Sequence, residues 1–145
     1  MTHIIESPYF TEAEFHGAYH KMDKNLLLKL HDLREEIDQP LNLSNNCKGF
    51  SRTLGGYNRS QHNIDVWGKC RAADGYIPED MSYQEFYEAC RAVGFTGIGL
   101  YTGWSTRGFH VDVRPDRDAN SPATWSGFYK DGGTQYKSIR ELTNA

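Results

Sequence analysis

His62, Asp74 and His110 have the side-chain types from which a reactive metal centre could be built. If the three meet in the fold, they supply two imidazoles and one carboxylate, a ligand set that suits zinc and leaves a fourth position for water. A metal site with an open position is hydrolytic, because the metal lowers the pKa of bound water to about 7 and polarises a carbonyl. Spacing alone does not select these residues, since the chain has six histidines and 19 acidic residues.

The segment FHVDVR, residues 109–114, has the alternation of a strand with one apolar and one polar face. Successive side chains of a strand point to opposite faces, so His110, Asp112 and Arg114 share one face. The apolar residues between them share the other face, which is predicted to contact the core.

The elements that must position these residues are predicted from apolar spacing and capping motifs. Apolar residues recur every three or four positions over 23–37, which predicts a helix. Thr-x-x-Glu and Ser-x-x-Glu capping boxes at Thr11 and Ser82 predict two further helices, the second ending at Gly94.

Strands are predicted at 41–44, 72–74, 96–101 and 109–114, the last two as an antiparallel hairpin. A polar, glycine-rich loop is predicted over 45–63, and loops of that length are often functional. The predicted fold class is therefore α+β, with N-terminal helices packed on a small, mainly antiparallel sheet.

Length and composition limit the domain organisation and the partners. A chain of 145 residues suffices for one core, so a single domain over 1–145 is predicted. The net charge of −3, without a basic stripe, argues against nucleic acid, and no apolar run approaches the ~20 residues of a membrane span. No secretory signal is visible, which predicts synthesis in a cytoplasm. The three widely spaced cysteines are predicted to be reduced.

Three motifs occur in a fixed order: SQHNIDVWGKCRAAD at 60–74, GIGLY at 97–101 and GFHVDVR at 108–114, followed by Trp125. This order resembles the zinc D-alanyl-D-alanine carboxypeptidase and L-alanyl-D-glutamate endopeptidase family, which has the hedgehog or DD-peptidase fold. The resemblance covers about residues 41–128, and the N-terminal flank is similar to phage-encoded members. It implies one Zn²⁺ held by His62, Asp74 and His110.

The sequence departs from the family pattern at two points. In most members the first histidine and the aspartate are seven positions apart, whereas His62 and Asp74 are twelve apart, so Asp65 is a rival ligand. We prefer Asp74 because it ends a predicted strand. Arg107 occupies the position where many members carry an acidic catalytic residue, and a guanidinium cannot act as a base.

The resemblance makes Asp112 and Arg114 the predicted catalytic residues. Asp112 could take the proton of the metal-bound water as general base, which we prefer, or it could orient a ligand histidine. Arg114 could pair with Asp112 or stabilise an oxyanion. Arg52 or Arg59 could bind a substrate carboxylate through the bidentate fork of a guanidinium. Arg52 is preferred, because it follows Ser51 at the position where many family members carry a Ser/Arg pair. The predicted substrate-binding residues are Ser51, Arg52, Arg59 and Tyr101.

The activity implied by the resemblance is a zinc metallopeptidase that hydrolyses peptidoglycan stem peptides, as a carboxypeptidase or an endopeptidase. The flanks suggest a phage endolysin or a virion-associated hydrolase, with virion proteins as partners and the cell wall or periplasm as the place of action. Two alternatives stay open. One is an inactive virion or structural protein on the same fold, favoured by Arg107; the other is a metal-free muropeptide-binding module that uses Tyr101, Trp104 and Arg52.

Overall fold

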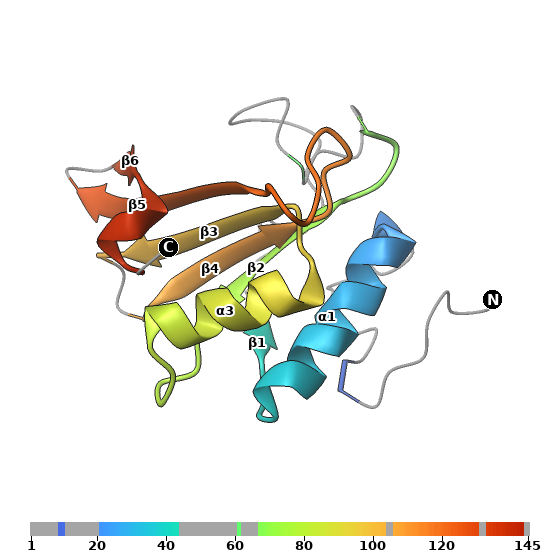
Figure 1. Ribbon diagram of the computed structural model, residues 1–145, viewed down its shortest axis with the longest axis horizontal. Coiled ribbons are helices and arrows are strands. Elements are labelled where there is room, and N and C mark those ends of the chain that lie inside the picture. Colours follow the sequence, from blue (N-terminus) through green and yellow to red (C-terminus); the bar gives the residue numbers. More distant parts are fainter. Residues whose placement is uncertain are drawn as a thin grey trace.

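The computed structural model describes residues 9–10, 21–43, 61, 67–103, 106–130 and 133–143. Two α-helices and six strands lie within these residues (Figure 1). The helices are α1 (Lys24–Ile37) and α3 (Tyr83–Val93). The strands are β1 (Asn42–Leu43), β2 (Ala72–Tyr76), β3 (Gly97–Thr102), β4 (Gly108–Asp112), β5 (Ala123–Lys130) and β6 (Gly133–Lys137). A 3-10 helix, η4 (Ile139–Glu141), follows β6.

Both helices begin at a side-chain cap. The Asp23 carboxylate accepts hydrogen bonds from two backbone N–H groups of the first turn of α1. The predicted capping box at α3 is confirmed, because Ser82 and Glu85 each bond the other's backbone N–H, at 3.0 and 2.9 Å. Gly94 ends α3 with a φ of 96°. The helix predicted at Thr11 lies outside the described residues, and no helix in the described part of the chain is long and apolar enough to cross a membrane.

The strands form one sheet in the order β1-β2-β4-β3-β5-β6. Every neighbouring pair is antiparallel except β3 and β5, which run parallel. The predicted hairpin of β3 and β4 is confirmed, as is the predicted α+β fold class. Strands β5 and β6 were not predicted, and they extend the sheet by two positions beyond β3.

The core lies between the two helices and one face of the sheet (Figure 1). Phe86 of α3 contacts Phe109 of β4, with ring centroids 4.8 Å apart. Cys70 and Cys90 are free thiols and are fully buried, as the composition predicted, whereas Cys47 lies outside the described residues. Other fully buried core residues from the helices and strands are Leu26, Leu30, Leu33, Ile98, Leu100 and Val111.

Candidate active site

The predicted site residues Asp74, His110 and Asp112 lie on the sheet face opposite the helices. Strand register places Asp74 of β2 directly beside His110 of β4. The same row continues to Gly99 of β3 and Trp125 of β5. Directly paired residues point to the same face of a sheet. Four strands that are distant in sequence therefore supply one row of adjoining positions.

Two glycines of β3 leave the space that the site side chains occupy. A Cβ atom at Gly99 would lie 2.5 Å from Nε1 of Trp125, and a Cβ atom at Gly97 would overlap the carboxylate of Asp112. Real Cβ atoms do not approach other heavy atoms that closely. The indole and the carboxylate thus lie directly on the backbone of β3.

Asp74 and His110 face each other across β2 and β4. Oδ1 of Asp74 lies 2.9 Å from Nδ1 of His110, and the aspartate side chain is 24% exposed. An imidazole nitrogen and a carboxylate oxygen are both ligands that zinc accepts, so the pair fits two of the three predicted ligand positions. Within the described residues, no group of three or more His, Cys, Asp or Glu side chains could hold a metal by itself.

The remaining predicted ligands fall in the part of the chain that the structure does not describe. His62 and its rival Asp65 lie there. Gln61, which precedes His62 in the chain, is described: its backbone carbonyl accepts from Arg71 N at 2.9 Å, and its side chain accepts from Arg71 Nε at 3.0 Å. Arg71 immediately precedes β2, so Gln61 is held beside the strand that carries Asp74. The predicted substrate-binding residues Ser51, Arg52 and Arg59 and the candidate Trp104 also lie outside the described residues.

Asp112 is fully buried, and each of its oxygens has two partners. Oδ2 lies 2.7 Å from Nε2 of His110 and accepts from Nη2 of Arg114 at 2.6 Å. Oδ1 accepts from the backbone N and the Nε of Arg114, at 3.2 and 2.9 Å. Burial raises the pKa of Asp112, but the hydrogen bonds from Arg114 and His110 outweigh it and hold the pKa well below its usual range. Asp112 is therefore a carboxylate at every pH of interest.

His110 is held from both sides of its ring by these two carboxylates. Burial lowers the pKa of His110, but hydrogen bonds to Asp112 and Asp74 outweigh that effect and raise the pKa to about 9. In the protein without a metal, the ring therefore carries a proton on each nitrogen at neutral pH. A histidine must be deprotonated at the ligating nitrogen before it binds a metal, so metal binding at Nδ1 is coupled to proton release.

Trp125 and Tyr101 form an aromatic wall beside His110. The indole lies with its centroid 5.1 Å from that of the imidazole, and its Nε1 donates to the Tyr101 hydroxyl at 2.9 Å. Burial and the charge of Asp74 raise the pKa of Tyr101, so its phenol stays neutral. Trp125 was noted in the sequence as part of the family pattern but was assigned no role, because its place beside His110 depends on the pairing of β5 with β3.

Arg107 lies on the helical side of the sheet. Its Nη2 donates to the backbone carbonyls of Pro78 and Glu79 at 2.7 and 3.3 Å, and its guanidinium lies 5.2 Å from the ring centroid of Tyr83 in α3. The side chain therefore anchors the connection before α3. Arg107 is at the position where many family members carry an acidic catalytic residue. Because its side chain lies on the face opposite His110, it does not contribute to the face that carries the candidate site.

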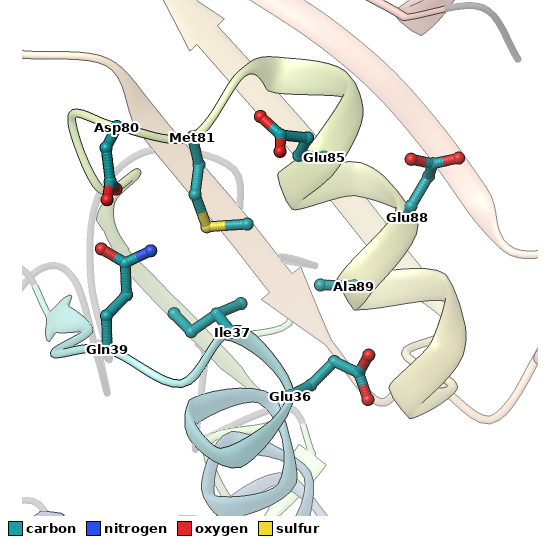
Figure 2. Close-up of a pocket in the computed structure, with 8 residues that line it drawn as sticks. All are labelled: Glu36, Ile37, Gln39, Asp80, Met81, Glu85, Glu88 and Ala89. Atoms are coloured by element: carbon teal, nitrogen blue, oxygen red, sulfur yellow. The ribbon is translucent and has the colours of Figure 1, made fainter.

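A groove of about 460 Å³ opens between the C-terminal end of α1 and α3 (Figure 2). Ile37, Met81 and Ala89 line it together with four carboxylates, those of Glu36, Asp80, Glu85 and Glu88. Both helices cover the sheet face opposite His110, so the groove is separate from the candidate active site.

A family model described as Peptidase M15 matches residues 8–112. The match covers well over half of the chain and includes His62, Asp74 and His110. The chain belongs to the peptidase M15 family. The resemblance read from the sequence is thereby confirmed, and M15 peptidases are generally zinc-dependent and act on peptidoglycan peptides. The M15 match ends at Asp112, so Arg114 and Trp125 lie beyond it. Comparisons with curated proteins and with solved structures gave no match.

Proposed function

We propose that this M15 peptidase hydrolyses stem-peptide amide bonds of peptidoglycan, with one Zn²⁺ held by His62, Asp74 and His110. The observation that carries the proposal is the 2.9 Å approach of Asp74 Oδ1 to His110 Nδ1 in a generally zinc-dependent family. The anchoring of Gln61 beside β2 supports His62 as the third ligand. When bound, the zinc polarises the scissile carbonyl and makes a water molecule more acidic.

Asp112 is proposed to position His110, which is the second of the two roles that the sequence left open. A hydrogen bond from Nε2 to Asp112 fixes the tautomer and the ring orientation, and so directs Nδ1 at Asp74. A general base must come within hydrogen-bond distance of the water it deprotonates. Asp112 is fully buried and is surrounded by four hydrogen-bond donors, which supports the positioning role better than the role of general base. Arg114 then neutralises Asp112 instead of reaching a substrate oxyanion.

The substrate is proposed to lie along the aromatic wall. The neutral phenol of Tyr101 and the indole of Trp125 border the site on the β5 side. Arg52, with Ser51 and Arg59 near it in the chain, is proposed to bind a substrate carboxylate. The cleaved bond is next to a D-amino acid or is the L-Ala–D-Glu bond, and the setting is a phage endolysin or a virion-associated hydrolase that reaches the cell wall.

Mass spectrometry of purified muropeptides, with zinc content measured on the same samples, tests the proposal. The wild type is expected to release product and to bind one zinc ion, and Asp74→Asn to lose both. Treatment with EDTA is expected to abolish product formation, and added zinc to restore it. Zinc binding without product would favour the inactive structural protein, and muropeptide binding without zinc would favour the binding module.

Asp112→Asn separates the two roles of that residue. A positioning residue of this kind typically changes metal affinity by about 10- to 100-fold, so the variant is expected to bind zinc more weakly and to regain activity in excess zinc. Wild-type zinc affinity together with lost activity would instead identify Asp112 as the general base.

A further inference from the structure

Tyr136 is an exposed aromatic residue on the edge strand β6. Its side chain is 66% exposed, and all five residues of β6 are exposed. Among the described residues, the other large hydrophobic side chain with comparable exposure is Leu28 of α1, at 44%. Burial of an aromatic ring is strongly favourable, so a ring left in water on the site face is a candidate contact for a ligand.

Strand register places Tyr136 on the same face as the candidate active site. Tyr101 pairs with Gly127 of β5, and Gly127 pairs with Tyr136 of β6. Tyr101 lies two residues after Gly99, and Gly127 two residues after Trp125, so all of these positions face the side of the sheet that carries His110.

Gly127 leaves room for the Tyr101 side chain between the site and Tyr136. A Cβ atom there would lie 2.9 Å from the ring of Tyr101 and 3.0 Å from Cγ2 of Thr134. The Tyr101 ring and the Thr134 methyl group therefore both lie beside the backbone of β5 at Gly127. By strand register, Trp125, Tyr101 and Tyr136 lie on one face of the sheet and form an aromatic strip that begins beside His110.

The length of this strip suits a ligand that extends well beyond the bond that is cleaved. β4 and β6 are three strand spacings apart, about 14 Å at about 4.8 Å per spacing. An extended chain of about four residues spans that distance. A stem peptide that is cleaved at its D-amino-acid end, with the reacting bond at His110, could therefore present its point of attachment to the glycan strand near β6. The L-Ala–D-Glu bond lies too close to that attachment point to span the same distance.

We propose that Tyr136 stacks on a sugar ring of the glycan strand, an inference that rests on the proposed function. A sugar ring offers one face of C–H groups and an edge of hydroxyls, which matches a single aromatic ring among polar neighbours. The neighbour of Tyr136 on the same face of β6 is Thr134, whose side chain is polar and exposed. A protein partner would require a contiguous apolar patch of several hundred Å², which one tyrosine does not supply.

Co-sedimentation with purified peptidoglycan sacculi, and with peptide-free glycan strands prepared by an amidase, tests the inference. Tyr136→Ala is expected to bind both materials about fivefold more weakly, since a stacked ring contributes on the order of 1 kcal/mol. Tyr136→Phe keeps the ring and is expected to bind as the wild type does. Leu28→Ala is the control, because it removes the other large exposed hydrophobic side chain of the described residues, from a helix on the other side of the sheet.

Activity provides a second measure. Tyr136→Ala is expected to lose more activity on intact sacculi than on a soluble stem peptide. Equal binding of wild type and Tyr136→Ala to peptide-free glycan would overturn the inference and leave the proposed function standing. Weaker glycan binding by Tyr136→Ala, in a protein whose wild type cleaves no stem peptide, would support the stacking site and refute the proposed function.

Discussion

Gly97→Ala is expected to displace the Asp112 carboxylate and so destabilise the site, because it places a methyl group where that carboxylate lies. Gly97 and Asp112 are directly paired on β3 and β4. The carboxylate cannot shift freely, since Arg114 and His110 hold both of its oxygens. Gly133→Ala is the matched control: Gly133 is also a strand glycine, neither glycine has a positive φ, and a Cβ atom there meets nothing within 4 Å.

The size of the effect follows from the interactions that must move. Forcing an extra carbon into a packed interior costs about 1–3 kcal/mol, and disrupting a buried ion pair costs about 3–5 kcal/mol. Because Asp112 would be displaced and not removed, we expect Gly97→Ala to lower the free energy of unfolding by about 3 kcal/mol. In a chain of this size each kcal/mol shifts the Tm by about 3 °C, so the expected loss is about 10 °C. Gly133→Ala is expected to change the Tm by no more than about 2 °C.

Thermal unfolding followed by circular dichroism, on both variants freed of metal at pH 7, provides the measurement. Urea titration then checks that the midpoint falls without a change in slope. If Gly97→Ala and Gly133→Ala unfold within about 2 °C of each other, the carboxylate does not rest on the β3 backbone, and the reasoning that links the glycine to the site is refuted.

Three further outcomes are expected. Ser82→Ala removes the cap of α3 and should lower stability by about 1 kcal/mol, measured as a Tm lowered by about 3 °C; an unchanged Tm would contradict the capping role. Burial raises the pKa of the Cys90 thiol, so its alkylation by iodoacetamide, mapped by mass spectrometry, should stay slow from pH 7.5 to 9.5 in the folded protein and become fast in urea. Arg107→Ala should lower stability by about 1–2 kcal/mol, through loss of its two carbonyl contacts, while zinc content and peptide hydrolysis stay at wild-type levels; a loss of zinc or of activity at unchanged Tm would place Arg107 in the site.

Local patterns of the sequence predicted the elements well, because caps and apolar spacing act within a few residues. The helix over 23–37 and the capping box at Ser82 are examples. The approach of Asp74 to His110 was expected only from the family resemblance. It depends on β2 pairing with β4 in one register, and no local pattern determines which strands become neighbours. The parallel pairing of β3 with β5, which brings Trp125 into the site, was not predicted for the same reason.

Arg107 and Asp112 show how the alternation of side chains along a strand adds to what a sequence motif predicts. Arg107 lies three positions before His110, and in a strand an odd separation places side chains on opposite faces. This rule alone predicts that Arg107 points away from His110. Asp112 was correctly placed on the face of His110, but its complete burial could not be predicted, because burial depends on the strands and side chains that pack around it.

The two ends of the aromatic strip differ in how firmly the sheet holds them. β4 is hydrogen-bonded on both sides, to β2 and β3, whereas among the strands that the structure describes β6 is paired with β5 alone. Edge strands open locally at a small fraction of the cost of global unfolding, so backbone amides of β6 should exchange with deuterium far sooner than those of β4. A polymer bound along the sheet could then release its distal end repeatedly while its reacting end keeps its alignment.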